Sequence, residues 1–183
     1  MMVYLLCGLA FSGKSTLAAA VHRRLGCALV SLDDLNARRG LHGGLGIPAE
    51  EWARTHREAL AEVEAALQAG RSVVVDDTNC FRFLRDDYRG IADRYGVPTV
   101  VLYLEAPLDL VRARMRVNES KPARAPVTEA VLRDLAEKFE PPAAEETVLV
   151  VPAGARLEDW VAGLLSDCRE SSMTGSSRSE EST

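Results

Sequence analysis

The chain has 183 residues, of which 47% are hydrophobic and 27% are charged, a length and composition typical of one soluble α/β domain. Its net charge of −5 weakens any long-range attraction to a polyanion, so long nucleic acid is not the favoured partner. No apolar stretch approaches the roughly 20 residues of a membrane span, and the first residues lack the pattern of an export signal. The cysteines stand singly, which favours reduced thiols and a cytoplasmic protein.

Short apolar runs alternate with helical patterns along most of the chain. The runs predict five strands buried on both faces, at residues 3–7, 28–32, 73–75, 99–104 and 147–151. Helical spacing of apolar residues predicts helices at 14–25, 50–69, 84–95, 108–117, 128–139 and 157–168. We therefore expect an α/β fold of three layers, a five-stranded parallel sheet with helices on both faces. Residues 1–168 are expected to form this domain, and residues 169–183 a disordered, serine-rich tail.

The stretch Gly8-x-x-x-x-Gly13-Lys14-Ser15 lies between the first predicted strand and the first predicted helix, which is the context of a phosphate-binding P-loop. In such a loop, main-chain N–H groups and the helix N-terminus converge on phosphate oxygens. Lys14 would reach the β- and γ-phosphates, and the Ser15 hydroxyl would bind Mg²⁺. The residues expected to bind the nucleotide are Gly8, Ser12, Gly13, Lys14, Ser15 and Thr16. The alternative is a glycine-rich turn with an incidental lysine.

Paired aspartates follow two of the predicted strands, at the carboxyl ends where ligands bind in open α/β sheets. Asp33 and Asp34 follow the second strand, where a carboxylate could accept the proton of an attacking hydroxyl. Asp76 follows the third strand and is favoured by position as a second ligand of Mg²⁺. The alternatives are that Asp33 caps the next helix and that residues 77–79 form the turn and cap before the following one.

Three arginines lie at alternate positions of the helix predicted at 108–117. Arg112 and Arg116 are four residues apart and share a helix face, so this face could look toward phosphates while Arg114 turns away. A flexible segment that carries such arginines could close over the donor, and we place this lid near residues 116–126. The alternative is a solvated arginine face that pairs with acidic neighbours.

A P-loop indicates a nucleotide but not a reaction. The Asn-Lys-x-Asp element of GTPases does not occur, and motors are generally larger, so a compact phosphotransferase is favoured. The motifs GLAFSGKST, SLDD, VVVDDTN, the segment from RVN to Arg124, and KFEPP together resemble the small P-loop kinases grouped with bacteriophage polynucleotide 5′-kinase. Chloramphenicol phosphotransferase and the seryl-tRNA(Sec) kinases are relatives in this group. The resemblance covers residues 1 to about 165, in order.

The resemblance implies the three-layer P-loop NTPase fold and roles for several residues. Asp34 matches the second aspartate of the family's pair, which acts as the general base. Arg116 and Arg124 match the lid arginines that contact the donor phosphates. The turn at 77–79 matches a segment near the acceptor. The residues expected on the acceptor side are Asp33, Asp34, Arg38, Asp77 and Asn79.

One departure from the family's pattern concerns the acceptor. The polynucleotide kinases place an arginine three residues after the base, whereas this chain has Ala37 there, followed by Arg38 and Arg39. Since that arginine serves the acceptor or its flanking phosphate, recognition of a nucleic-acid end is less favoured. A different acceptor becomes more plausible.

The acceptor is expected over residues 35–56, the stretch least explained by nucleotide binding. The glycine-rich loop at 40–46 could open and close. Ile47, Trp52 and His56 could present an apolar or stacking wall to the acceptor. The alternative is that these side chains simply pack or face water.

We therefore predict an ATP- and Mg²⁺-dependent kinase that transfers the γ-phosphoryl group to a hydroxyl of a small or medium-sized acceptor, such as a nucleoside, a sugar or a hydroxylated antibiotic. The predicted catalytic residues are Lys14, Asp34, Arg116 and Arg124, and the predicted metal ligands are Ser15 and Asp76. Two alternatives are a kinase of polynucleotide 5′-hydroxyl ends or of tRNA, and a non-catalytic ATP-binding sensor. The sequence leaves the oligomeric state and the choice between ATP and GTP open.

Overall fold

A sheet of five parallel strands, in the order β2-β3-β1-β4-β5, forms the centre of the molecule. The computed structural model describes residues 1–42, 46–121 and 127–164. The strands are β1 (Val3–Cys7), β2 (Ala28–Ser31), β3 (Val73–Asp76), β4 (Thr99–Leu104) and β5 (Val148–Val151). Each agrees with its predicted range to within one residue at either end, and the predicted parallel sheet is confirmed.

The central strand, β1, pairs with β3 on one side and β4 on the other, so that Leu5 lies between Val75 and Val101. All five residues of β1 are buried. A continuous apolar run suits this place because a strand of a parallel sheet is covered by helices on both faces. The carboxyl end of β1 leads directly into the glycine-rich loop.

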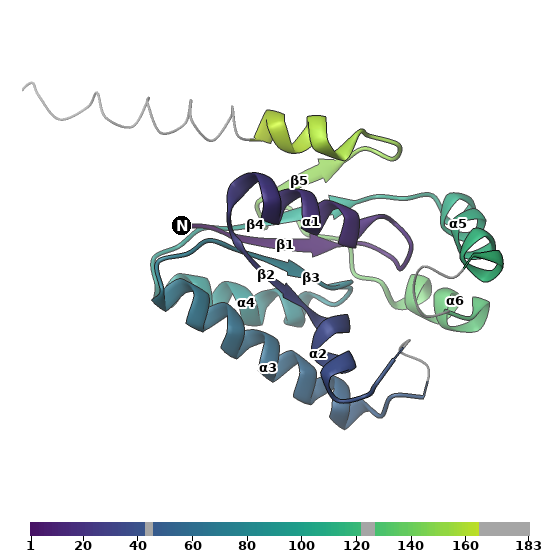
Figure 1. Ribbon diagram of the computed structural model, residues 1–183, viewed down its shortest axis with the longest axis horizontal. Helices are drawn as coiled ribbons and strands as arrows, with labels where there is room; N and C mark the ends of the chain where they lie inside the picture. Colours follow the sequence, from purple (N-terminus) through teal and green to yellow (C-terminus); the bar gives the residue numbers. More distant parts are fainter. Residues whose placement is uncertain (43–45, 122–126, 165–183) are drawn as a thin grey trace, which may run out of the picture.

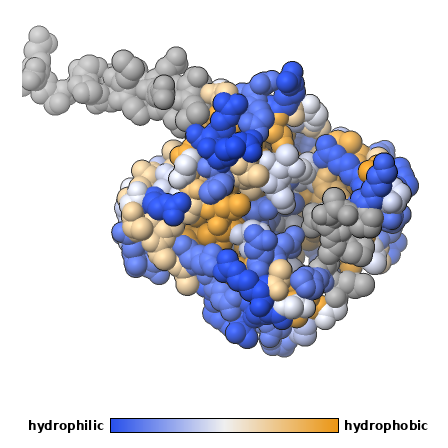
Figure 2. Space-filling model, in the orientation of Figure 1, coloured by the Kyte–Doolittle hydropathy of each residue, from blue (hydrophilic) through white to orange (hydrophobic). Residues whose placement is uncertain are grey.

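Helices cover both faces of the sheet, as predicted (Figure 1). The covering helices include α1 (Lys14–Leu25), α3 (Ala49–Gln68) and α4 (Arg82–Arg94), and two further helices are α5 (Leu108–Ser120) and α6 (Glu129–Lys138). One face of the sheet packs on α3 and α4 through a core that includes Val63 and Tyr88. The other face packs on α1 and on the helical residues 157–164, through Leu17 and Val161 among others. The outer surface of α3 is mostly hydrophilic, as expected of an amphipathic helix (Figure 2).

One helix was not predicted: α2 (Leu32–Arg38), which begins directly after β2. The Ser31 hydroxyl caps it by accepting a hydrogen bond from the backbone N–H of Asp34 at 3.2 Å. The alternative in which Asp33 is the cap is therefore wrong. The apolar run of β2 continues into the buried Leu32, so the run alone could not mark where the strand ends and the helix begins.

The helices α5 and α6 stand apart from the covering layers, beyond the carboxyl ends of the strands (Figure 1). Val111, Met115 and Leu132 form a small apolar core between them. Leu9 and Phe11, from the loop after β1, pack against this core. The two helices therefore lie beside the segment that is predicted to bind phosphate.

Some predictions fall outside the described residues. They concern Arg124, the part of the lid at 122–126, the end of the last helix beyond residue 164, and the tail at 169–183. Within the described ranges, none of the helices combines the length and hydropathy needed to cross a membrane.

Candidate active site

The loop between β1 and α1 adopts backbone conformations that its glycines permit. Gly8 has a φ of +145°, and a Cβ added there would lie 2.7 Å from the carbonyl oxygen of Leu104 on β4. Gly13 has a φ of +112° and caps the N-terminus of α1. Residues with side chains rarely adopt either conformation. The loop therefore turns tightly against β4 and leads into a helix N-terminus, whose N–H groups and dipole favour an anion.

Two polar side chains of the loop are buried within it. Lys14 is 7% exposed, and its Nζ donates a hydrogen bond to the carbonyl oxygen of Leu9 at 2.8 Å. The buried Oγ of Ser12 has no hydrogen-bond partner among the described residues. Because a buried hydroxyl without a partner is costly, the loop fits a ligand whose oxygen atoms would accept its hydrogen bond.

Asp76, at the end of β3, meets the first turn of α1. Its carboxylate accepts a hydrogen bond from the Ser15 hydroxyl. Burial raises the pKa of the Asp76 carboxyl, and the Ser15 hydrogen bond and the charge of Lys14 offset only part of this effect. A hydroxyl and a carboxylate in contact beside a lysine suit Mg²⁺, which keeps phosphate and water oxygens in its other positions. The residues present therefore fit the predicted ligands.

A closed metal cage is not formed by the part of the chain that the structure describes. Within it, no group of three or more His, Cys, Asp or Glu side chains could hold a metal ion. Mg²⁺ at phosphate sites commonly takes one or two protein ligands and several other oxygens. The arrangement is thus suited to a cation that arrives with a nucleotide rather than to a structural metal.

Hydrogen bonds of its own side chains stabilise the turn after β3, at residues 77–79. Burial raises the pKa of the Asp77 carboxyl, although the backbone N–H groups of Thr78 and Asn79 donate hydrogen bonds to it. Asn79 is fully buried, and its Nδ2 donates a hydrogen bond to the carbonyl oxygen of Leu6 at 2.7 Å. This burial contradicts the predicted contact between Asn79 and an acceptor. The side chain instead ties the turn to the central strand, since it has the length and the amide donor to reach a β1 carbonyl.

The two aspartates at the start of α2 face different surroundings. Both are exposed, but only Asp33 lines the cavity over the loop, together with Lys14 and Ser15. The charge of Asp33 also raises the pKa of the Asp76 carboxyl, whereas the charge of Asp34 acts on Arg38. Successive residues of a helix point about 100° apart, so one of the pair faces the phosphate loop and the other turns toward α3.

A cavity of ≈ 560 Å³ lies over the phosphate loop. Residues 11–16 and Asp33 line its polar part, together with Arg114 of α5. Most of the remaining wall is small or apolar and is formed by Leu104, Ala106, Leu110, Val117, residues 151–155 and Leu157. A volume in the range of roughly 300–1,000 Å³, with an anion-binding loop and an apolar wall, is typical of small-molecule sites.

The arginines of α5 point differently from the prediction. Arg114, expected to turn away, donates hydrogen bonds from Nη1 to the loop carbonyls of Phe11 and Ser12, at 2.9 and 2.7 Å. Arg112 instead pairs with Glu129 of α6, with Nη2 and Oε1 2.8 Å apart. Arg116 is exposed. The expectation that Arg112 faces the phosphates is therefore wrong, whereas Arg114, which was expected to turn away, reaches the site.

The orientation of α5 follows from its buried positions. Val111, Met115 and Asn118 are buried, at spacings of four and three residues. Arg114 lies between Val111 and Asn118, three and four residues from them, and therefore shares their face. Spacing alone showed which arginines share a face, but not which face meets the loop. The apolar positions of the same helix held the missing signal.

Two residues predicted near the acceptor form other contacts. Arg38 is exposed, and its Nη1 pairs with Glu62 of α3 at 2.7 Å. His56 lies with its Nε2 2.9 Å from Asp87 of α4, and its ring packs edge to face on Tyr88. His56 therefore joins α3 to α4, which is the packing alternative rather than the acceptor wall. Arg38 is drawn to α3 because a glutamate lies within reach.

Comparison with known proteins identifies the family. A family model described as an AAA domain matches residues 3–142. An L-seryl-tRNA(Sec) kinase of Methanococcus maripaludis is 28% identical over 146 residues, or 77% of this chain and 53% of that protein. An adenylyl-sulfate kinase of Myxococcus xanthus is 31% identical over 111 residues, which is 60% of each chain. The chain thus spans little more than half the length of these curated relatives.

Solved structures share the fold. The crystal structure of a sugar kinase from Janibacter sp. HTCC2649 has a TM-score of 0.68 at 20% sequence identity, covering 90% of this chain and 92% of that one. The narrower resemblance to polynucleotide 5′-kinase and chloramphenicol phosphotransferase is not tested by these matches and stays a prediction. Because the family model matches well over half of its length, the chain belongs to the AAA domain family, with the α/β fold of the small P-loop kinases.

Proposed function

We propose that the protein is an ATP- and Mg²⁺-dependent kinase that transfers the γ-phosphoryl group to a hydroxyl of a small or medium-sized acceptor. The observation that carries the proposal is a ≈ 560 Å³ cavity lined by Lys14 and Ser15, with the Asp76 carboxylate hydrogen-bonded to Ser15. Relatives with the printed names L-seryl-tRNA(Sec) kinase and adenylyl-sulfate kinase support a phosphotransferase in general terms. They do not agree on an acceptor.

The binding part of the mechanism uses the loop and the start of α1. The main-chain N–H groups of the loop and the Lys14 ammonium would hold the β- and γ-phosphates, in place of the bond that Lys14 now makes to Leu9. Ser15 and Asp76 would hold Mg²⁺, which neutralises charge on the transferring group when it is bound. The apolar wall formed in part by residues 151–155 would accept the nucleobase of ATP.

The transfer itself needs a base for the acceptor hydroxyl. The oxygen of that hydroxyl attacks the γ-phosphorus. The bond between the γ-phosphorus and the ADP oxygen breaks, and the hydroxyl proton passes to a carboxylate. The resemblance assigns this role to Asp34. The contacts favour Asp33, because it lines the cavity and its charge reaches Asp76 and Asp77. We therefore propose Asp33 as the base and keep Asp34 as the alternative.

Arginines would stabilise the charge of the transferring group. Arg114 already lies against the phosphate loop and lines the cavity, so its guanidinium is within reach of a bound triphosphate. Arg116 and Arg124 keep the lid role that the resemblance implies, as proposals. Arg116 is exposed and is not among the residues that line the cavity, and Arg124 lies outside the described residues.

Charges near the aspartate pair support a small acceptor over a nucleic-acid end. Arg38 pairs with Glu62, and Arg39 pairs with Glu51 and Glu58. All three glutamates belong to α3, so both arginines that follow the aspartates are engaged within the protein. The phosphates of a polynucleotide would have to displace carboxylates to reach them.

A screen of ADP release tests the proposal, with nucleosides, sugars, hydroxylated antibiotics and 5′-hydroxyl oligonucleotides as acceptors. The Lys14→Ala variant serves as the blank, because removing this charge should lower transfer on the order of 10²–10³-fold. Lys138→Ala is the matched control, since Lys138 is exposed and pairs with Asp134, one turn earlier on its own helix. Calorimetry that shows no binding of Mg·ATP or Mg·GTP to the folded protein would overturn the proposal.

A further inference from the structure

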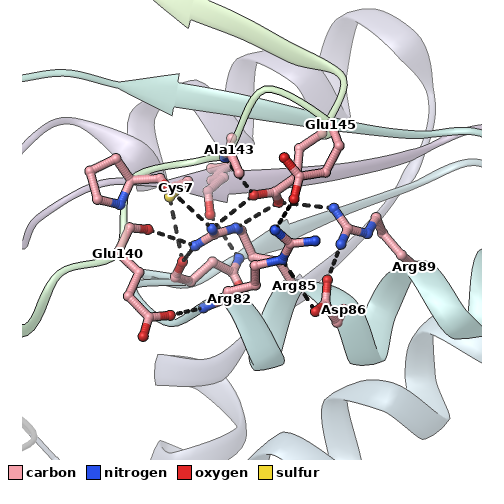
Figure 3. A network of polar contacts seen from close by, with 12 residues as sticks. Cys7, Arg82, Arg85, Asp86, Arg89, Glu140, Ala143 and Glu145 are labelled. Carbon is pink, nitrogen blue, oxygen red and sulfur yellow. Dashed lines mark hydrogen bonds and ion pairs between the residues drawn. The ribbon is translucent and has the colours of Figure 1, made fainter.

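A buried ion pair lies beside the turn at 77–79, which follows Asp76 at the end of β3. Arg85 of α4 and Glu146, before β5, are both fully buried in their side chains. Arg85 Nε lies 2.8 Å from Glu146 Oε1, and Nη2 lies 2.9 Å from Oε2, so the pair is bidentate. Glu146 also accepts a hydrogen bond from the backbone N–H of Ala143 at 2.8 Å. Figure 3 shows the Arg85 guanidinium at the centre of this network.

The remaining nitrogen of Arg85 binds backbone rather than Glu146. Nη1 donates to the carbonyl oxygen of Asn79 at 2.8 Å and to that of Glu140 at 3.0 Å. The Cys7 thiol also donates to the Asn79 carbonyl, at 3.4 Å. One guanidinium thus connects the turn after β3, the segment after α6 and the segment before β5. A lysine in its place could not supply donors in three directions in one plane.

Hydrogen bonds connect the turn at 77–79, which Arg85 contacts, to β1 and the phosphate loop. The backbone N–H of Gly8 donates to the carbonyl oxygen of Thr78 at 3.0 Å, and Asn79 Nδ2 donates to Leu6. Asn79 has a φ of +43°, a left-handed conformation that a non-glycine residue keeps only when its surroundings fix it. Its carbonyl is the group that Arg85 holds. Arg85 therefore binds the residue next to Thr78, whose carbonyl oxygen accepts the hydrogen bond from Gly8.

A buried ion pair is by itself weak support for stability. Desolvation opposes the attraction, and apolar side chains of similar volume often replace such pairs without loss. What apolar side chains cannot replace is the set of charge-assisted hydrogen bonds to main-chain carbonyls. This difference indicates that Arg85 is needed for the shape of the turn, and Glu146 for keeping the Arg85 guanidinium in place.

We propose that Arg85, oriented by Glu146, is a positioning residue that fixes the turn at 77–79 so that Asp76 meets Ser15 and the phosphate loop begins at the correct place. The inference rests on the proposed function, because it assigns the pair a part in binding Mg²⁺ with a nucleotide. It assigns no contact with substrate to either residue.

The test compares ADP affinity with and without Mg²⁺, measured by calorimetry on the full chain. Groups that orient metal ligands typically change metal affinity by about 10–100-fold. We therefore expect Arg85→Lys to lower the Mg²⁺ enhancement of ADP affinity by about tenfold or more. Arg82→Lys is the matched control and should keep the wild-type enhancement. Arg82 lies on the same helix, and its side chain pairs with Glu145, next to Glu146, and with Asp86.

A second variant guards against misfolding. Arg85→Met combined with Glu146→Leu removes both charges, so neither is left buried alone. It should fold and show the same reduced enhancement as Arg85→Lys. A wild-type enhancement in either folded variant would overturn this inference and leave the proposed function intact. Loss of folding in both variants would make the role purely structural and overturn it too. A wild-type protein that does not bind ADP would overturn the proposed function, and this inference with it.

Discussion

Two groups of charged side chains lie near the turn after β3, and they differ in how far opposite charges and hydrogen bonds within the protein compensate them. Glu146 is buried, which by itself raises the pKa of its carboxyl, yet the hydrogen bonds from Arg85 lower that pKa overall. Asp76 and Asp77 are half-buried, and their pKa values stay raised despite hydrogen bonds and the charge of Lys14. The charge of Glu146 is therefore compensated within the protein. The charges of Asp76 and Asp77 are compensated only in part.

The difference has a simple physical origin. In the first group, a bidentate arginine meets one carboxylate, and a second arginine, Arg89, lies 3.2 Å from it. In the second group, Asp76 and Asp77 share the field of Lys14, whose Nζ is bonded to Leu9, and the charge of Asp33 opposes both. An excess of carboxylate destabilises the folded chain until a cation binds. Incomplete compensation therefore distinguishes the proposed metal-binding group from the ion pair that we propose to support it.

The largest expected effect separates the two aspartates of α2. Asp33→Asn should lower the rate of transfer to any acceptor found in the screen by about 10²–10⁴-fold, the usual contribution of a general base. Asp34→Asn, the matched control, should leave the rate nearly unchanged, because Asp34 faces Arg38. ADP affinity should hardly change in either variant. The reverse pattern of rates would assign the base to Asp34.

The matched group can be broken by removing one of its partners. Arg85→Met leaves Glu146 buried and unpaired, which should lower the free energy of unfolding by about 3–5 kcal/mol. Adding Glu146→Leu should restore most of this loss, since neither charge of the pair then remains. Urea unfolding of the two variants and the wild type measures both steps. Equal stability of the single and double variants would show that the ion pair is not the source of the loss.

Removing a charge from the group of Asp76 and Asp77 should raise stability rather than lower it. Asp76→Asn removes a charge that burial disfavours, so the melting temperature of the nucleotide-free protein should rise. The same variant should lose the Mg²⁺ enhancement of ADP affinity. Asp93→Asn, an exposed change on α4, serves as the control and should alter neither quantity. A fall in melting temperature for Asp76→Asn would mean that the carboxylate is fully compensated after all.

Lowering the pH should change the contributions of the two groups to stability in opposite directions, and these are the smallest of the expected effects. Because the folded-state pKa of Glu146 is lowered, its contribution to stability is present above the ordinary glutamate pKa of 4.5 and is lost as the pH falls through the folded value. Because the folded-state pKa of Asp76 is raised above 3.8, its destabilising effect is present at neutral pH and fades as the pH falls.

Melting curves between about pH 3 and pH 8 check this contrast. The curves of Glu146→Gln and the wild type should converge in acid, as should those of Asp76→Asn and the wild type. At neutral pH, Glu146→Gln should melt below the wild type and Asp76→Asn above it. Two differences of the same sign at neutral pH would remove the contrast between the groups.

The sequence by itself determined the features that depend on neighbouring residues. The apolar runs gave the strands, and the glycine spacing placed the phosphate loop between β1 and α1. The residues that follow each run of a parallel sheet meet at one edge, so Ser15 and Asp76 could be paired in advance. The P-loop motif needed no tertiary information, since its strand, turn and helix are contiguous in the chain.

Only the tertiary structure decided how side chains are oriented and which distant groups meet. The face of α5 that packs on Leu132 of α6 determines that Arg114 rather than Arg112 reaches the loop. Arg85 and Glu146 are 61 positions apart, and nothing local links them. A charged residue at a core position of α4 was their one visible sign. Such pairings depend on how helices pack across the sheet, and packing is a property of the whole chain rather than of any short stretch.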